Sequence, residues 1–280
     1  MNTFEFTAVI GLGALVAGFL GALTGLGGGV VIVPLLTVVF GVDIHYAIGA
    51  ALVSVIATSS GAAAAYVREG YSNVRVGMFL EIATTVGALV GAALILHLRV
   101  SILSIIFGVV LLYSAYASLN EHSHSTSDDG PDRVATWLRM DSTYPNPSGT
   151  AADGMESYHV RRVPQGFALM FVAGVLSGLL GIGSGAVKVL AMDKAMKLPF
   201  KVSTTTSNFM IGVTAAAGAG VYLRRGYIDP GLAMPVMLGV LVGSLIGARV
   251  LAGAKVKVLR VVFSGVIAVL AVEMIYNGLK

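Results

Sequence analysis

The sequence predicts an all-α membrane protein that crosses the bilayer many times, because its composition, its segment lengths and an internal repeat agree. Of its 280 residues, 56% are hydrophobic and 11% are charged, and the mean hydropathy is +0.87. A soluble domain of this size needs more charge on its surface. A transmembrane β-barrel alternates apolar and polar residues over about ten positions, whereas the segments here are uniformly apolar. The spans are therefore expected to be helices.

The composition also excludes several classes of function. The net charge of +4 does not indicate a nucleic-acid partner, because the basic residues lie in short segments between apolar runs. The chain has no cysteine, which excludes disulfides and thiol chemistry. It lacks an ATP-binding Gly-x-x-x-x-Gly-Lys-Ser/Thr sequence, a His/Glu metal pair on one helix face and a nucleophile beside a base. We therefore expect no cofactor, metal ion or catalytic residue, and no cleaved signal peptide.

A glycine-rich stretch at residues 25–29 interrupts the first apolar run, which extends from about Phe4 to Phe40. About 20 helical residues suffice to span the hydrocarbon core, so this run is too long to cross it once unbroken. Glycine is poor in helix interiors, and Pro34 removes a helical hydrogen bond. The stretch predicts a break between two helical arms. The alternative is a tightly packed membrane helix, in which glycine and proline are common.

The break recurs 156 residues later, and so do many other features. Because a shared Tyr-x-Arg-x-Gly-Tyr is improbable by chance, the chain is interpreted as two copies of one unit, an organisation found in many secondary transporters. Ser184 takes the place of Gly28 in the second copy. The offset pairs Gly18 with Gly174, Gly25 with Gly181, Gly27 with Gly183, Gly29 with Gly185, Thr58 with Thr214, Tyr66 with Tyr222, Arg68 with Arg224, Gly70 with Gly226, and Tyr71 with Tyr227.

Each copy is expected to contain a broken hairpin followed by three helices, giving about ten helical segments. The first copy, residues 1–119, has arms at about 4–23 and 27–40 and helices at about 47–67, 76–96 and 100–119. The second copy, residues 164–280, has arms at about 166–180 and 186–196 and helices at about 203–223, 231–251 and 256–276.

Residues 120–163 form the one long polar segment. His122, His124 and Asp128 are candidate metal ligands, but the small and Ser-rich composition favours a solvated linker. Trp137, Tyr144 and Tyr158 indicate a minor ordered piece, such as a strand pair at the membrane surface. This segment is expected to be a cytoplasmic loop.

The distribution of Lys and Arg predicts the topology. If each broken run enters and returns, one side of the membrane holds most of the basic residues, as the positive-inside rule requires. The two copies are then inverted, with both termini outside a prokaryotic cell and the central loop in the cytoplasm. The basic side would hold Arg68, Arg75, Arg133, Arg139, Arg161, Arg162, Lys194, Lys197, Lys201, Arg249, Lys255, Lys257 and Arg260, and the other side Arg99, Arg224, Arg225 and Lys280.

Two broken runs in inverted repeats are expected to meet near the bilayer midplane. Irregular backbone at that depth needs protein or a water-filled cavity around it. The helical arms that begin after Gly29 and Gly185 would present free amides and a positive dipole end, which favour an anion.

Lys188 lies in an apolar run where the first copy has Ile32, and an intramembrane lysine is a candidate functional residue. It is equally well read as a snorkelling lysine or as a structural partner of Glu81. Glu81 is the candidate for proton coupling, since Glu273 lies close to the C-terminus.

The polar residues 203–208 are expected to open a helix, and they serve there either as caps or as substrate ligands. Thr58 and Thr214 are most simply packing residues between helices.

Several motifs resemble the TauE/SafE family of anion permeases. They are the Gly25-Leu-Gly-Gly-Gly stretch with Pro34, Ala47-Ile-Gly-Ala-Ala, Tyr66-Val-Arg-Glu-Gly, Ser177-Gly-Leu-Leu-Gly-Ile-Gly-Ser-Gly and Ser203-Thr-Thr-Thr-Ser-Asn-Phe-Met. The resemblance implies export of sulfite or transport of organosulfur anions, with the two glycine stretches in the substrate pathway. Ser184 and Leu190 depart from the family pattern of a glycine and a proline, so the second break is expected to be less distorted.

The sequence therefore predicts a secondary transporter of a small anion, sulfite or an organosulfonate, in the cell inner membrane. The alternatives are an anion channel and a carrier of a non-sulfur organic anion. The expected partners are the anion, the lipid bilayer and a coupling proton or ion, and a homo-oligomer is compatible with the sequence. The predicted substrate-binding residues are Gly25, Gly27, Gly28, Gly29, Thr58, Gly181, Gly183, Ser184, Gly185, Lys188, Thr205, Ser207 and Asn208.

Overall fold

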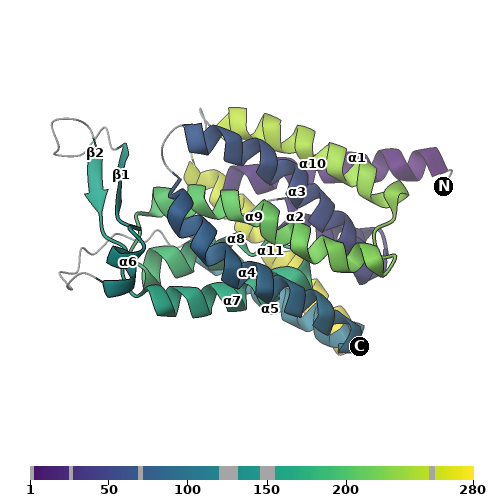
Figure 1. Ribbon diagram of the computed structural model, residues 1–280. Helices are drawn as coiled ribbons and strands as arrows, with labels where there is room; N and C mark the ends of the chain where they lie inside the picture. The colour runs from purple at the N-terminus through teal and green to yellow at the C-terminus, as the bar shows by residue number, and fades with distance from the viewer. Residues whose placement is uncertain (1–2, 25–27, 69–71, 120–131, 146–154, 252–255) are drawn as a thin grey trace.

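Helices dominate the part of the chain that the computed structural model describes, residues 3–24, 28–68, 72–119, 132–145, 155–251 and 256–280 (Figure 1). The prediction of a helical chain is confirmed, and the helix bounds agree with the sequence to within about three residues. The α-helices in this part of the chain are α1 (Thr3–Thr24), α2 (Gly29–Pro34), α3 (Ile44–Arg68), α4 (Val74–Leu94), α5 (Val100–Leu119), α6 (Arg133–Trp137), α7 (Val163–Leu180), α8 (Gly185–Leu190), α9 (Phe200–Arg224), α10 (Pro230–Leu251) and α11 (Val256–Leu279).

Two of these helices, α4 and α7, are long and apolar enough over their described residues to cross a membrane by length and composition alone. Six further apolar stretches of 10–17 residues lie in α1, α2 with the segment after it, α3, α5, α10 and α11. Many large apolar side chains on these helices face outward, including Leu12, Met78 and Val269. An outward apolar surface of this kind suits lipid rather than water.

Both broken runs fold back on themselves as hairpins. In the first run, the ring of Phe40 lies 6.4 Å from that of Phe6 at the start of α1, so the second arm returns to the level at which the first began. In the second run, the carbonyl of Met196 accepts a hydrogen bond of 3.0 Å from the backbone N–H of Arg161, just before α7. Met196 lies 156 residues after Phe40. The two hairpins therefore close at equivalent positions.

A π-helical segment follows each short arm, at Leu35–Val39 (η1) after α2 and at Ala191–Ala195 (η3) after α8. These segments are also 156 residues apart. Pro34 precedes the first, whereas Leu190 precedes the second. Proline is therefore not required for the wider turn, which both copies adopt with either residue.

The long helices pair across the two halves of the chain, and close approaches at glycine hold the pairs together. α7 packs on α4, where a side chain on Gly174 would collide with the carbonyl of Thr84. α1 packs on α10, where a side chain on Gly18 would collide with the carbonyl of Val240. Both residues of the second contact lie 156 positions from their counterparts in the first. Small residues at these positions let the helix backbones touch.

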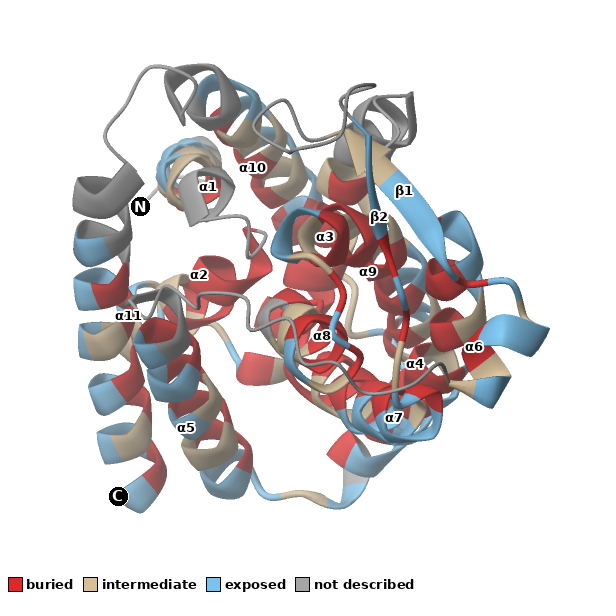
Figure 2. Cartoon of the chain, turned by 90° about the vertical axis from the view of Figure 1, so that its left-hand side faces the viewer, coloured by how far each residue is buried: buried red, intermediate tan, exposed pale blue. Residues whose placement is uncertain are grey.

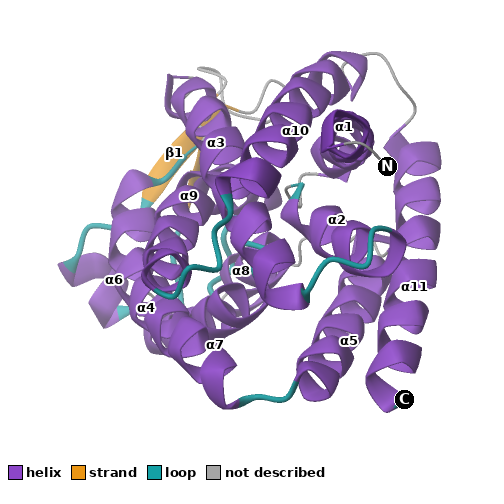
Figure 3. Ribbon diagram, turned by 90° about the vertical axis from the view of Figure 1, so that its right-hand side faces the viewer, coloured by secondary structure: helices purple, strands orange, loops and turns teal. Residues whose placement is uncertain are grey.

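Equivalent helices of the two halves run antiparallel to each other. In the pair α5 and α11, Gly278 lies beside Ser101, whereas the Ser264 hydroxyl donates a hydrogen bond of 3.2 Å to the carbonyl of Ala115. In the pair α3 and α9, Gly49 lies beside Tyr227. Figure 3 shows α5 and α11 side by side at one flank of the molecule.

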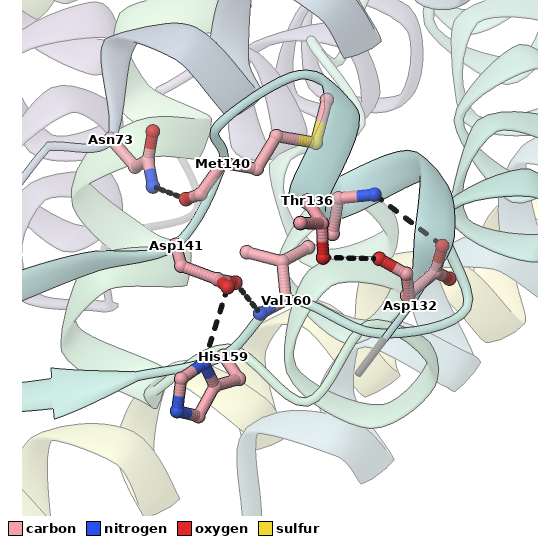
Figure 4. A network of polar contacts seen from close by, with 8 residues as sticks. Asn73, Asp132, Thr136, Met140, Asp141, His159 and Val160 are labelled. Carbon is pink, nitrogen blue, oxygen red and sulfur yellow. Dashed lines mark hydrogen bonds and ion pairs between the residues drawn. The ribbon is translucent and has the colours of Figure 1, made fainter. Parts of the chain in front are cut away.

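A small polar layer covers one end of the helices, where α6 joins the antiparallel strands β1 (Ser142–Pro145) and β2 (Met155–Tyr158). The predicted strand pair in the central segment is thus confirmed. Asn73, the N-cap of α4, anchors the layer, because its amide donates a 2.8 Å hydrogen bond to the Met140 carbonyl (Figure 4). The same amide donates a 2.8 Å hydrogen bond to the Tyr158 hydroxyl. Burial of the Tyr158 hydroxyl raises its pKa.

Asp132 joins this layer to α7. Its carboxylate accepts hydrogen bonds from the backbone N–H groups of Val134, at 2.8 Å, and Val163, at 3.0 Å, so it caps the first turns of both α6 and α7. Partial burial of the carboxyl raises its pKa, but the backbone donors, Val163 first, outweigh that effect and hold the pKa below its ordinary value of 3.8.

The close packing at Gly174 leads to a stability prediction. Gly174→Ala should lower the free energy of unfolding by about 1–3 kcal/mol, because the added methyl group meets backbone that cannot move aside. Gly220→Ala is the matched control, since nothing lies within 4 Å of that position on α9 and alanine favours the helix. Thermal unfolding in detergent measures both variants. Equal midpoints for the two would contradict this account of the α4–α7 contact.

The capping role of Asp132 leads to a pH prediction. Because its folded-state pKa is depressed, its contribution is complete above 3.8 and is lost as the pH falls through the folded value. The anisotropy of Trp137, the single tryptophan, should therefore fall in acid in the wild type. Asp132→Asn should remove this dependence, and Asp43→Asn, at the other end of the molecule, should retain it. An unchanged acid profile in Asp132→Asn would exclude the cap as its source.

Candidate functional site

The two glycine breaks meet in the interior of the helix bundle. Gly29, the first residue of α2, lies against the carbonyl of Gly181 and the backbone of Ile182, with Val55 of α3 beside it. Every residue of α2 is buried. Figures 2 and 3 both show α2 and α8 in the middle of the molecule, surrounded by the longer helices. Gly25 and Gly27 lie outside the described residues.

The second break has a strongly distorted backbone. Gly181, Gly183 and Ser184 have φ angles of 67°, 69° and 46°, all in the left-handed region. That region costs a residue with a side chain roughly 1–2 kcal/mol, and Ser184 adopts it nonetheless. Ser184 thus keeps a left-handed conformation that favours glycine. The expected comparison with the first break falls on residues 25–27, which lie outside the described residues. Strain of this kind is concentrated at functional sites.

Two buried serine hydroxyls near the second break have no hydrogen-bond partner among the described residues. Ser184 is 2% exposed and Ser177, in the last turn of α7, is 0% exposed. A buried polar group without a hydrogen-bond partner lowers the free energy of unfolding by about 1–3 kcal/mol, so such groups are rare in native protein interiors. Unpaired hydroxyls at a distorted break are what a binding site for a hydrogen-bonding ligand would contain.

Lys188 lies one helical turn beyond Ser184, whose carbonyl accepts a 3.0 Å hydrogen bond from the Lys188 backbone N–H. Its side chain is fully buried, so the interpretation as a snorkelling lysine is wrong. The ammonium Nζ donates a hydrogen bond of 2.5 Å to the hydroxyl of Thr214 on α9. That hydroxyl donates in turn to Glu81 Oε1 on α4, at 2.7 Å. Thr214 thus bridges the lysine and the carboxylate.

Glu81 is satisfied on one oxygen only. Oε1 also accepts a 3.1 Å hydrogen bond from the hydroxyl of Thr85, whereas Oε2 is buried with no partner among the described residues. The hydroxyl of Thr84 lies 3.4 Å from that of Thr214. A buried charge is stable only when it is paired and hydrogen-bonded. The site therefore holds an ion pair that is bridged by a hydroxyl and incompletely satisfied.

This cluster has no counterpart at the positions that the repeat relates to it. At the positions 156 residues away from Lys188 and Glu81, the chain has Ile32 and Met237. Thr58, the counterpart of Thr214, donates only within its own helix, to the carbonyls of Ser54 at 3.1 Å and Val55 at 3.2 Å. The fold is repeated, but the charged chemistry is not.

The polar start of α9 differs from the expectation. Pro199 is the N-cap and the helix begins at Phe200, so residues 203–208 lie inside it and cap nothing. Pro199 places the start there because its fixed φ suits a helix entry. Ser207 donates a 3.3 Å hydrogen bond to the carbonyl of Gly185 and so joins the break. Thr205 donates to its own helix, at the Lys201 carbonyl, and Asn208 is half-buried.

The structure therefore gathers only part of the predicted site. Gly28, Gly29, Gly181, Gly183, Ser184, Gly185, Lys188 and Ser207 lie at or beside the breaks, while Thr58 and Thr205 are bonded within their own helices. The sequence analysis missed Ser177 and the bridging role of Thr214. The repeat pairs Thr214 with Thr58 but does not predict the bridge. The bridge follows from the hydrogen bonds of Thr214 to Lys188 and Glu81. Asp193 is buried in η3.

The bridge leads to a stability prediction. Thr214→Val should cost roughly 1–3 kcal/mol, because it leaves the Lys188 ammonium without its hydroxyl acceptor and Glu81 Oε1 with Thr85 as its one remaining donor. Thr58→Val is the matched control, with a hydroxyl that only bonds back to its own helix, and it should cost much less. Thermal unfolding of the two purified variants makes the comparison, and equal losses would show that the bridge contributes nothing.

Comparisons with known proteins agree with the architecture. The family described as Sulfite exporter TauE/SafE matches residues 10–274. The probable membrane transporter protein YunE of Bacillus subtilis is 28% identical over 98% of this chain and 99% of its own. The probable membrane transporter protein MJ0441 of Methanocaldococcus jannaschii is 25% identical over 97% of both chains. No solved structure matches. The chain therefore belongs to the TauE/SafE family of multi-pass membrane transporters, whose members are not enzymes.

Proposed function

We propose that this transporter moves a small anion, sulfite or an organosulfonate, by alternating access, and that the anion binds at the two glycine breaks. One observation carries the proposal. A fully buried lysine, Lys188, lies one helical turn from the unpartnered hydroxyl of Ser184, in the arm that starts at the second break. Oxyanions accept hydrogen bonds from ammonium and hydroxyl groups and from backbone amides, and a site with these donors selects negative charge. The family is described as one of sulfite exporters, which favours a sulfur oxyanion as the substrate.

The proposed mechanism needs two inverted repeats, residues 1–119 and 164–280, whose helices pack into two groups that change their relative tilt. One group contains α4, α7, α8 and α9, and the other contains α1, α3 and α10. The antiparallel packing of α5 on α11 and of α3 on α9 supports this, because only a two-fold axis perpendicular to the helices relates such pairs. The two hairpins also close at equivalent positions, Phe40 and Met196, which further supports the two-fold relation between the repeats. Rocking of one group of helices against the other would expose the breaks to each side in turn.

The proposed topology places both termini outside the inner membrane and the central segment in the cytoplasm. The polar layer of α6, β1 and β2 lies at one end of the helices, and both termini lie at the other (Figure 1). Basic residues lie at the layer. The Arg75 guanidinium donates a 2.9 Å hydrogen bond to the carbonyl of Arg139 there. The positive-inside rule assigns such an end to the cytoplasm.

An anion channel is the rival class, since the same donors could line a filter. Fluxes per molecule in liposomes separate the two, because a rocking carrier turns over far more slowly than a channel conducts. A carrier of a non-sulfur organic anion differs only in the ligand that binds. Transport in either case would draw on the gradient of the anion or of a coupling ion.

The transport proposal is tested by anion binding. Sulfite or methanesulfonate should bind the purified wild type saturably, and Lys188→Met should weaken binding by about 10–100-fold, the value of a charge-assisted hydrogen bond. Lys194→Met is the matched control, because Lys194 lies on the same arm but is exposed. This variant should bind the anion as tightly as the wild type. Ser184→Ala, a milder change, should also weaken binding.

Two results would contradict the proposal. Binding that Lys188→Met and Ser184→Ala both leave unchanged would return these side chains to structural roles. Binding of a cation such as choline, without any binding of the anions, would remove anion transport altogether.

A further inference from the structure

We propose that the Glu81–Thr214–Lys188 cluster couples the anion to a proton, so that each anion bound at Lys188 is accompanied by one proton bound at Glu81. This inference rests on the proposed anion transport and adds the coupling ion and its stoichiometry. It makes the transporter an anion–proton symporter. The step forms no bond to the anion and oxidises nothing, since one proton passes from water to a carboxylate oxygen.

The charge balance of the cluster carries the inference. Lys188 is 0% exposed and Glu81 is 9% exposed, and together they have no net charge. A monoanion that binds the Lys188 ammonium competes with the carboxylate for it and leaves one uncompensated negative charge in a region poor in water. Uptake of one proton by Glu81 removes that charge.

The hydrogen bonds allow both protonation states. When Glu81 is ionised, the Thr214 hydroxyl donates to Oε1 at 2.7 Å and accepts from Lys188. When Glu81 carries a proton on Oε1, it can donate to the Thr214 oxygen, and the Thr214 proton can turn to the Met210 carbonyl, 3.0 Å away. Oε2 has no partner among the described residues, so the ionised state is the less completely satisfied one. Thr214 therefore acts as a two-position switch.

Lys188 is the charged group that faces Glu81. On α4 itself, Arg75 lies at the N-terminal end and hydrogen-bonds to the polar layer. α7, which packs along α4, has no ionisable side chain in its sequence. On α9, Lys201 lies in the first turn and Tyr222 and Arg224 in the last two, away from Thr214 in the middle. η2 (Ile95–His97) has one histidine, His97, beyond the far end of α4.

The asymmetry of the repeat sets the stoichiometry. The positions 156 residues from Lys188, Thr214 and Glu81 hold Ile32, Thr58 and Met237, which offer neither a cation nor a carboxylate. Two symmetric anion sites would each require such a pair. One pair predicts one proton for each anion.

Proton uptake on anion binding tests the inference directly. Methanesulfonate is fully ionised at neutral pH, so any proton taken up must bind the protein. A pH-indicator dye in weakly buffered detergent solution should report about one proton per methanesulfonate bound to the wild type, and affinity should fall about tenfold per pH unit where Glu81 is ionised. Glu81→Gln, which mimics the protonated acid, should bind with no uptake and no pH dependence.

Controls separate this inference from the transport proposal. Glu273→Gln removes an exposed carboxylate from another apolar helix, α11, and should retain the full uptake. Sulfite itself exchanges a proton near neutral pH. With sulfite, the proton uptake of the wild type minus that of Glu81→Gln therefore gives the uptake by the protein. Wild-type anion binding without proton uptake overturns the coupling and leaves anion transport intact. Failure of both anions to bind overturns the transport proposal, and the coupling with it.

Discussion

The fold depends on a constraint that the bilayer imposes, because backbone groups in hydrocarbon find no water and must be satisfied by the protein. The broken runs place irregular backbone at the centre of the helices, so that backbone has to be covered on all sides. Burial of all of α2, and of Gly181 to Gly185 in the second break, meets this demand. The glycine contacts also help to cover this backbone. A side chain at Gly174 or Gly18 would collide with the neighbouring backbone and push the covering helices away.

The packing does not follow the two halves of the sequence. α4, from the first half, packs on α7 and α9 from the second, while α10, from the second half, packs on α1 and α3 from the first. Each group therefore mixes helices of both copies. Lys188, Thr214 and Glu81 all belong to the group of α4, α7, α8 and α9, so the ion pair lies within one group. The facing surface from the other group is apolar, with Gly29 and Val55 against the second break.

The sequence predicts the elements well because their signals are local. Apolar runs bounded by polar turns place most helix ends within about three residues, and the 156-residue offset predicts equivalent hairpins. The start of α9 is predicted less well, since a row of hydroxyls resembles a cap, whereas Pro199 is the N-cap and the helix begins at Phe200. The partners of Lys188 could not be predicted, because Thr214 and Glu81 are distant in sequence and meet only through packing of α8, α9 and α4.

A hydroxyl bridge gives a transporter something that a direct salt bridge does not. A lysine and a carboxylate in direct contact in a dry interior hold each other strongly, and separating them is costly. Thr214 keeps the two charges apart by two hydrogen bonds, and its hydroxyl can reverse direction because the Met210 carbonyl is within reach. When Glu81 carries a proton on Oε1, it can donate to the Thr214 oxygen while the Thr214 hydroxyl donates to the Met210 carbonyl. In the proposed mechanism, this bridge keeps the pair buried and still lets an anion compete for the lysine.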